Sequence, residues 1–250
     1  MSVRCFIPPE EWPSGPEVRL SGREGHHLVR VLRVRKGDTV ICLDGRGKEM
    51  ECTVEEAAGS RLLLRGGPEK RLPPLSWEVT LAVAVPGQGR LEEIVNSSTQ
   101  LGVMHLLPLQ TERTVVRFTE ERFLKKKEHL RQVAIEAAKQ SEAVRLPEIH
   151  PVMTWKQFQP TLSFYDRSFL GAVEGPHEDW RGLLEANRDP RKVLLLIGPE
   201  GDFTPEEIRQ AIAAGAHPVS LGPNVLRCET AVASSLSILF YLLRETSGAA

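Results

Sequence analysis

The strongest constraint in this sequence is an apolar run that ends in a glycine-proline loop and leads at once into a helix start. Residues 193–197 have the length and continuous apolarity of a strand buried on both faces. Residues 198–201 (Gly-Pro-Glu-Gly) break the strand. Thr204, Pro205 and Glu207 then form an N-cap, a first-turn proline and a capping box. Open α/β folds bind ligands where a strand meets a helix N-terminus in this way, so the segment predicts such a site.

A second segment repeats this order of short strand, glycine-proline loop and helix. Residues 219–221 precede Gly222-Pro223, and a helix is predicted from about residue 229 to 244. Arg227 and Glu229 stand at the start of that helix, where side chains can contact a ligand. Neither loop has the spacing G-x-G-x-x-G or G-x-x-x-x-G-K-[ST], so dinucleotide and P-loop sites are disfavoured. Taken alone, the first loop could equally be an ordinary strand-to-helix turn.

Strands and helices alternate from residue 79 onward. Besides the two units above, strands are predicted at residues 79–85, 105–109 and 161–165, and helices at residues 91–101, 120–141 and about 180–186. Such alternation predicts an α/β fold with a mostly parallel sheet and helices on both faces.

The first part of the chain has a different pattern. Alternating apolar residues at 39–43, 50–54 and 61–64, with a turn at Asp44-Gly45-Arg46-Gly47, indicate a small β-rich domain. Residues 66–74 are rich in glycine and proline, which predicts a linker. The predicted domains are therefore residues 1–72 and 73–250.

Composition narrows the class of protein. Of 250 residues, 41% are hydrophobic and 26% charged, as in a globular protein, and the net charge of -1 gives no global sign of nucleic-acid binding. No apolar stretch is long enough to span a bilayer and no leader opens the chain, so no membrane association is expected. The four cysteines (Cys5, Cys42, Cys52 and Cys228) lack C-x-x-C spacing, and no ligand cluster is visible. We expect a cytoplasmic protein without a metal.

A local basic region does indicate nucleic-acid binding. Residues 19–36 hold six basic side chains and one acidic side chain, Glu24. In a short helix here, Leu28, Val31 and Leu32 would share one face, and His26, Arg30 and Arg33 another. A basic face without carboxylates is suited to phosphates. The alternative is a solvated surface.

These features resemble the 16S rRNA (uracil-N3-)methyltransferase family, a branch of the knotted SPOUT methyltransferases. The two loop segments are similar to its C-terminal motifs. Its N-terminal and middle signatures are matched, in the family's order, by Arg4-Cys5-Phe6-Ile7-Pro8, by residues 26–33 around His26-His27, by Asp44-Gly45-Arg46-Gly47, by Leu101-Gly102-Val103 and by Pro108-Leu109-Gln110-Thr111-Glu112-Arg113. The resemblance covers nearly the whole chain.

The resemblance implies a SPOUT-type trefoil knot in the second domain and a PUA-like barrel in the first. It implies transfer of a methyl group from S-adenosylmethionine to N3 of a uracil in 16S rRNA, on free rRNA or on the assembled small subunit. Charge spreads to O2 and O4 as the N3 proton leaves, and a guanidinium would stabilise it. We assign this role to Arg227, for which the alternative is an ion pair with Glu229. Glu229 or Glu200 would accept the proton or contact the cofactor.

The remaining site residues also come from the resemblance. The predicted cofactor contacts are Phe164, Tyr165, Leu196, Ile197, Gly198, Pro199, Glu200, Gly201, Leu221, Gly222, Pro223, Val225, Leu226 and Arg227. The predicted RNA contacts are Arg4, His26, His27, Arg30, Arg33, Arg46 and Arg113.

A homodimer is also expected. The last helix has a second apolar face of Ile238, Tyr241 and Leu242, which must be covered. SPOUT enzymes generally pair through the knot region, although another helix of the same chain could cover this face.

The middle of the chain departs from the family pattern at residues 87–89, 97–100 and 139–143. A SPOUT enzyme with another RNA target, or an RNA-binding protein without activity, therefore remains an alternative. The sequence leaves open the target nucleotide and the general base.

Overall fold

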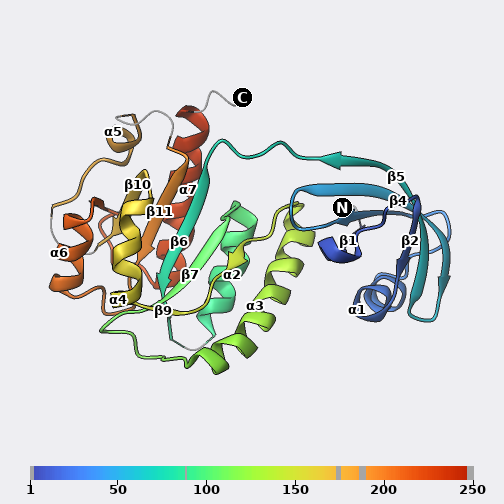
Figure 1. Ribbon diagram of the computed structural model, residues 1–250, viewed down its shortest axis with the longest axis horizontal. Helices are drawn as coiled ribbons and strands as arrows, with labels where there is room; N and C mark the ends of the chain where they lie inside the picture. The colour runs from blue at the N-terminus through green and yellow to red at the C-terminus, as the bar shows by residue number, and fades with distance from the viewer. Residues whose placement is uncertain (1–2, 88, 173–175, 186–189, 247–250) are drawn as a thin grey trace. The chain divides into compact units, whose positions relative to one another are not determined.

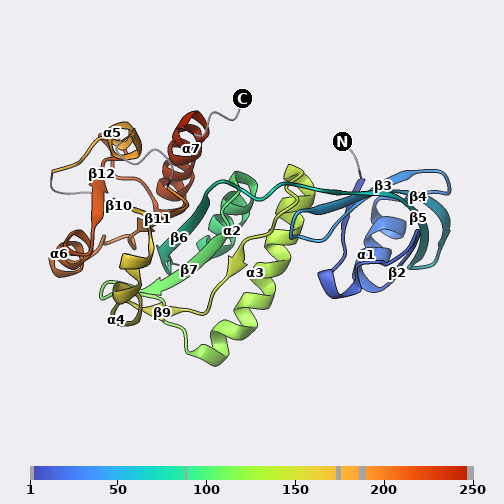
Figure 2. The same ribbon diagram turned by 45° about the horizontal axis from the view of Figure 1, so that its top comes forward.

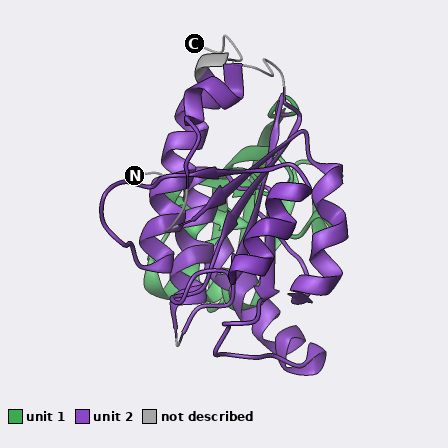
Figure 3. Cartoon of the chain, turned by 90° about the vertical axis from the view of Figure 1, so that its left-hand side faces the viewer, with its two compact units in different colours: residues 1–74, 135–146 green, residues 75–134, 147–250 purple. Residues whose placement is uncertain are grey.

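The computed structural model describes two compact units, over residues 3–87, 89–172, 176–185 and 190–246 (Figure 3). Unit 1 comprises residues Met1–Pro74 and Ile135–Leu146, and unit 2 comprises residues Leu75–Ala134 and Pro147–Ala250. The helix α3 (Glu120–Ser141) therefore begins in unit 2 and ends in unit 1. A single boundary in the sequence cannot describe this division, because the chain returns to unit 1 more than sixty residues after leaving it.

Unit 1 is built on a five-stranded sheet. Its strands are β1 (Val3–Phe6), β2 (Glu17–Leu20), β3 (Thr39–Leu43), β4 (Lys48–Ala58) and β5 (Arg61–Arg71), in the order β1-β3-β4-β5-β2. Only β1 and β3 are parallel, so most of the sheet is an antiparallel meander, as predicted. A short 3-10 helix (Pro9–Glu11), the helix α1 (Gly22–His26) and a π-helical turn (His27–Val31) complete the unit.

The prediction of a linker at residues 66–74 was wrong for most of its length. β5 continues to Arg71 and pairs with β4 as far as Lys48. Beyond Arg65 its other side has no pairing with β2, so β5 is there an edge strand, which tolerates proline. Pro68 also falls in the register shift between Met50 and Cys52, where a bulge removes the need for its missing N–H.

The predicted helical face around Leu28 was only partly right. Leu28 is fully buried, but Val31 and Leu32 are 58% and 43% exposed. The cause is the π-helical turn, in which the Leu32 N–H donates to the His27 carbonyl instead of the i−4 carbonyl. Its wider turn shifts the phase of the side chains, so that i, i+3 and i+4 spacing no longer gives one face. Arg33, at φ 57°, then ends the helix.

Three of the four cysteines, distant in sequence, lie together in unit 1. The sulfur atoms of Cys5 and Cys42 are 3.3 Å apart, and those of Cys42 and Cys52 are 3.5 Å apart. All three are free thiols in the core. The hydrogen bond with Cys5, together with burial, raises the pKa of Cys42, and the hydrogen bond with Cys42, together with burial, raises the pKa of Cys52. Protonated thiols of this kind pack as small apolar side chains.

Unit 2 contains a larger sheet in which every pairing is parallel. Its main order is β12-β10-β11-β6-β7-β8, and β9 also pairs with β7 (Figures 1 and 2). The strands are β6 (Glu78–Ala84), β7 (His105–Gln110), β8 (Glu148–Ile149), β9 (Met153–Thr154), β10 (Arg167–Gly171), β11 (Lys192–Ile197) and β12 (Ala216–Val219). The parallel sheet predicted from alternation is confirmed.

Helices cover both faces of this sheet, also as predicted. One face carries α2 (Arg90–Leu101), α5 (Trp180–Glu185) and α7 (Cys228–Thr246), and α7 contacts the other two helices. The other face carries α4 (Trp155–Phe158), a 3-10 helix η3 (Gln159–Phe164) and α6 (Pro205–Ala213), packed on a core that includes Leu107, Leu170, Leu194 and Phe203. No helix among the described residues is long and apolar enough to cross a membrane.

The strand predicted at residues 161–165 was wrong. Those residues belong mainly to η3, and the strand is β10, which begins at Arg167. Apolar residues occur in both segments, but Pro160 near the start of η3 favours a helical first turn. Residues 161–165 therefore lie at the amino end of β10 and not at its carboxyl end.

Candidate functional site

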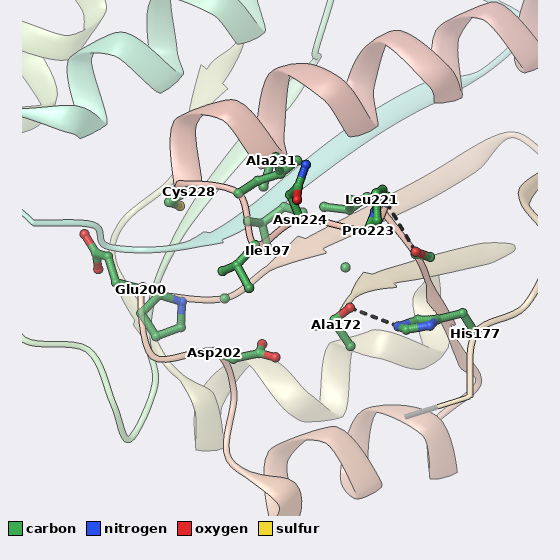
Figure 4. Close-up of a pocket in the computed structure, with 17 residues that line it drawn as sticks. Ala172, His177, Ile197, Glu200, Asp202, Leu221, Pro223, Asn224, Cys228 and Ala231 are labelled. Carbon is green, nitrogen blue, oxygen red and sulfur yellow. Dashed lines mark hydrogen bonds between the residues drawn. The ribbon is translucent and has the colours of Figure 1, made fainter. Parts of the chain in front are cut away.

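The candidate site lies where three neighbouring strands end. Gly171 of β10 is level with Ile197 of β11 on one side and with Val219 of β12 on the other. Because the three strands are parallel, the loops that follow them emerge at one edge of the sheet. These loops and the first turns of α7 enclose a cavity of about 130 Å³ (Figure 4).

The cavity has apolar side walls and a polar rim. Ile197, Leu221, Leu226 and Ala231 supply apolar surface, and the glycines and prolines of the two loops expose main-chain groups. The complete lining is Gly171, Ala172, His177, Ile197, Gly198, Pro199, Glu200, Asp202, Ser220, Leu221, Gly222, Pro223, Asn224, Val225, Leu226, Cys228 and Ala231. Apolar walls with a few polar groups are typical of sites for small molecules.

The loop after β11 is held in place from its far side. The Thr204 hydroxyl and the Glu207 carboxylate form the predicted capping box of α6. The Glu207 carboxylate also accepts the Glu112 N–H at 3.0 Å, and Arg113 donates to the Gly201 carbonyl at 2.7 Å. The segment after β7 therefore fixes both the loop and the helix start.

The loop after β12 is fixed by a tryptophan and by glycine geometry. The indole N–H of Trp180 donates to the Ser220 carbonyl at 3.1 Å, and the Trp180 ring stacks on Phe169. Gly222 has φ 113°, which side-chain-bearing residues rarely adopt. The loop thus needs glycine at this position to turn into the cavity wall.

Arg90, at the start of α2, links three segments at the rim. Its guanidinium donates to Glu200 Oε1 at 2.9 Å, and the same oxygen accepts the Gly87 N–H at 2.9 Å. The Arg90 Nε also lies 4.0 Å from Glu229 Oε2 of α7. This oxygen is buried and has no hydrogen-bond partner among the described residues. Arg90 thus lies within 4.0 Å of both proposed functional carboxylates, Glu200 and Glu229.

These contacts give the carboxylates of Glu200 and Glu229 different chemical roles. Burial raises the pKa of Glu200, but the Gly87 N–H, the backbone of Glu200 and the charge of Arg90 outweigh it, and the pKa is lowered. A carboxylate that is held ionised by donors is a weak base. Glu200 is therefore better suited to holding its loop, which leaves Glu229 as the candidate proton acceptor.

The Cys228 thiol and the Arg227 side chain, both at the start of α7, differ in burial. Burial, with the charges of Glu200 and Glu229, raises the pKa of the Cys228 thiol to about 12, so it stays protonated and is no nucleophile. Arg227 is exposed, and its carbonyl accepts the Ala231 N–H in the first turn of α7. Within the described residues its side chain has no ion pair, so the alternative of an Arg227–Glu229 pair is not observed.

The structure brings together most of the predicted cofactor contacts. Nine of them line the cavity: Ile197, Gly198, Pro199, Glu200, Leu221, Gly222, Pro223, Val225 and Leu226. Leu196 is buried in the sheet, and Gly201 lies behind the loop, where an added Cβ would meet only the Arg113 side chain. Arg227 adjoins the lining residues Leu226 and Cys228 without belonging to the lining.

Phe164 and Tyr165 lie elsewhere, which corrects their predicted role. They line a separate cavity at the amino ends of the strands, beside Thr80 and Lys192. The error follows from the misplaced strand, since residues 161–165 precede β10. The residues of the β10 end that do line the pocket are Gly171 and Ala172.

The predicted RNA contacts fall into three groups. His26, Arg30, Arg33 and Arg46 are exposed on unit 1, and His27 is partly buried. Arg4 is buried and ion-paired with Glu49 and Glu142, so its side chain is engaged in the fold. Arg113 is likewise engaged, by the carbonyls of Gly201 and Phe203. Charge alone in the sequence could not distinguish these settings.

Several lining residues were not predicted. Asp202 and Asn224 directly follow the two predicted loops, residues 198–201 and Gly222-Pro223, and Asp202 has φ 60°, an uncommon conformation that often marks a functional loop. Their place directly after the loops was a usable signal. The lining residue His177 and the rim residue Arg90, which contacts Glu200, come from other segments, and only the fold brings them to the site.

Family models match both units of the chain. A model described as an RNA methyltransferase domain matches residues 73–240, and one described as an RNA methyltransferase PUA domain matches residues 20–65. A protein named ribosomal RNA small subunit methyltransferase E from Synechocystis sp. is 35% identical over 98% of this chain and 79% of its own length. The protein of the same name from Bacillus subtilis is 28% identical over 90% of both chains.

Solved structures give the same result. A structure described as a methyltransferase from Legionella pneumophila with bound SAM has a TM-score of 0.84 at 30% identity, over 96% of this chain and 97% of that one. The ribosomal RNA small subunit methyltransferase E of Neisseria gonorrhoeae has a TM-score of 0.82 at 23% identity, over 97% and 98% of the two chains, and supports the fold.

Proposed function

The chain belongs to the ribosomal RNA small subunit methyltransferase E family, and we propose that it methylates N3 of a uracil in 16S rRNA with S-adenosylmethionine. The observation that carries the proposal is the cavity formed by the loops after β10, β11 and β12 and the start of α7. It lies in the matched methyltransferase domain, and the relative from Legionella pneumophila holds SAM within the same fold.

The cavity residues fit this cofactor. Ile197, Leu221 and Leu226 offer apolar faces for an adenine ring, and the loop backbone can read its edge. Gly222 keeps its loop surface free of a side chain, so that a ligand can approach the main chain closely, and Gly198 lets its loop fold tightly, because an added Cβ would lie 3.0 Å from the Asp202 carboxylate. When bound, S-adenosylmethionine supplies the electrophilic methyl group.

The protein must then manage one proton and the negative charge that its loss leaves. Uracil N3 becomes nucleophilic as its imide proton departs, and charge spreads to O2 and O4. The exposed Arg227 guanidinium, next to the cavity, is proposed to stabilise this charge. Glu229 is proposed to accept the proton directly or through water, because Glu200 is engaged by Arg90 and the Gly87 N–H.

Unit 1 is proposed to bind the RNA backbone. His26, Arg30 and Arg33 present exposed basic groups on the α1 and π-helical segment, with the exposed Val31 and Leu32 beside them. Phosphate contacts of this kind position a protein without reading sequence. Arg46 is a further exposed candidate, whereas Arg4 and Arg113 are assigned to structural roles.

The proposed partners are 16S rRNA, free or in the small subunit, and a second copy of the chain, in the cytoplasm. The test is mass spectrometry of 16S rRNA from a strain that lacks the gene. A uridine that loses an N3-methyl group and regains it on complementation supports the proposal. If the lost mark lies on another RNA, a SPOUT enzyme with a different target is correct. If no methyl group is lost from any RNA, the alternative of an RNA-binding protein without activity is favoured.

The first prediction concerns the loop after β12. Gly222→Val should weaken S-adenosylmethionine binding at least tenfold, because a side chain at φ 113° must move the loop that lines the cavity. Gly215→Val is the matched control, since Gly215 also has a positive φ, of 93°, with open space around it, but lies outside the lining. Calorimetric titration measures both, and equal affinities would mean that the cofactor binds elsewhere.

The second prediction concerns Arg227. Arg227→Ala should lower the single-turnover methylation rate by about 10²–10³-fold and leave S-adenosylmethionine affinity unchanged, because the guanidinium acts on charge that develops during reaction. The methylation rate of Arg227→Lys should lie between those of the parent and Arg227→Ala, since lysine keeps the charge but lacks the planar guanidinium. Arg209→Ala removes another exposed arginine, on α6, as a control. A normal rate in Arg227→Ala would refute the assignment.

The third prediction concerns RNA affinity. Arg30→Ala and Arg33→Gly should each lower the slope of log affinity against log salt by about one unit, through loss of one phosphate contact. Glycine is chosen at Arg33 because it accommodates φ 57°. Arg19→Ala, which removes an arginine already paired with Glu17, should leave the slope unchanged. Unchanged slopes for Arg30 and Arg33 would make this a solvated surface.

The fourth prediction is a homodimer that involves α7. Leu242 is only 7% exposed within one chain, so it cannot test the interface cleanly, whereas Tyr241 is 60% exposed. Sedimentation should give twice the 27.8 kDa chain mass, and Tyr241→Glu should shift it toward monomer. A monomeric and fully active parent chain would end the proposal.

A further inference from the structure

A second group of polar side chains lies at the other edge of the unit 2 sheet, away from the cavity. His105 is the first residue of β7, and its backbone is level with Glu148, the first residue of β8. His150 follows β8 by one residue. The two segments are more than forty residues apart in sequence, which is why spacing alone predicted no metal site.

The three side chains converge on one point. His105 Nδ1 lies 3.1 Å from His150 Nε2 and 3.6 Å from Glu148 Oε2, and His150 Nε2 lies 4.0 Å from Glu148 Oε2. One ligand atom from each residue is within 4.8 Å of the other two. Two imidazoles and a carboxylate form one of the commonest three-ligand sets for zinc and related ions.

The distances fit a metal ion with little movement. Ligands about 2.0–2.1 Å from a tetrahedral ion are roughly 3.3–3.4 Å apart, close to the separation of the two imidazole nitrogens. The Glu148 side chain is 64% exposed and free of tight packing, so it can close the longer distances by rotation. From this geometry we propose that His105, Glu148 and His150 bind a divalent transition-metal ion of the zinc class.

The surroundings support the same assignment. Glu78 Oε2 lies 3.9 Å from His105 Nε2, the ring nitrogen that faces away from the cluster. The Glu78 side chain is 51% exposed, so a small rotation would bring this carboxylate within hydrogen-bonding distance, where it would orient the histidine ligand and make it more basic. The His150 N–H donates to the Leu106 carbonyl at 2.9 Å, which fixes the backbone that carries the second imidazole.

The site is reachable and has room for water. His105 and His150 are each 30% exposed and line the second cavity, with Thr80 and Tyr165. Three protein ligands leave at least one position of a four-coordinate ion for water. Within the described residues this is the one cluster with such a ligand set. The alternative is a hydrogen-bonded histidine pair with no ion.

The ion would fasten an otherwise weak sheet edge. β8 has two residues and pairs with β7 at only two positions. A bond from each strand to one ion closes a loop of more than forty residues, and binding free energy adds to the stability of the folded state. The role is structural and distinct from methyl transfer, so its failure would leave the proposed function untouched.

The experiment is titration of the untagged, chelator-treated full-length chain with Co²⁺ and Zn²⁺. We expect one Co²⁺ per chain, with visible absorption of nitrogen and oxygen ligands, and a rise in Tm of several degrees with Zn²⁺. His105→Ala, His150→Ala and Glu148→Gln should each lose at least tenfold in affinity, and Glu78→Gln about tenfold. His217→Ala, which breaks a single His–Glu pair, is the matched control and should bind normally.

Circular dichroism and melting in metal-free buffer check that each variant folds. Glu148→Gln keeps the proposal testable if a histidine variant does not fold, because its side chain is exposed. A parent chain that binds no ion would overturn the proposal. So would His150→Ala and Glu148→Gln variants that bind like the parent. A thiolate charge-transfer band would also overturn it, since it would assign the ion to the cysteines.

Discussion

Parallel, in-register pairing of β12, β10 and β11 is the constraint on which the proposed active site depends. It brings Gly171, Ile197 and Val219 level, so that three loops leave the sheet at one edge. Described residues from all three loops line the cavity. The buried apolar residues of β11 supply the rigidity, and the loops supply main-chain groups at fixed positions.

Charge then fixes the rim of that cavity. Arg90, at the start of α2, donates to Glu200 in the loop after β11 and lies near Glu229 at the start of α7, so one guanidinium connects these three segments. The family pattern is altered at residues 87–89, directly before this arginine, yet the loop retains a contact through the Gly87 N–H. Burial raises the pKa of Glu200, but the hydrogen bonds from the Gly87 N–H and the Glu200 backbone, together with the charge of Arg90, lower it overall, which separates the roles of the two carboxylates.

Local sequence patterns correctly predicted those elements in which the pattern agrees with the tertiary packing. The capping box at Thr204 and Glu207, the buried strand β11 and the long helix α3 followed from the sequence. Predictions failed where context overrides local pattern. Val31 and Leu32 are exposed because a π-helical turn changes the spacing of the side chains. Pro68 lies within an edge strand, where no linker forms, and Phe164 and Tyr165 lie at the amino end of β10, away from the cavity. Long-range contacts, such as those that bury Arg4 or join His105 to His150, leave no local signal.

The Arg90–Glu200 pair is tested most directly by calorimetric titration of S-adenosylmethionine into the parent chain, Arg90→Ala, Glu200→Gln and the double variant. We expect one site per chain, weaker binding in each single variant, and a double variant little worse than either, because both changes break the same contact. An inert parent chain, or effects that simply add, would contradict the claim that this pair shapes the cofactor site.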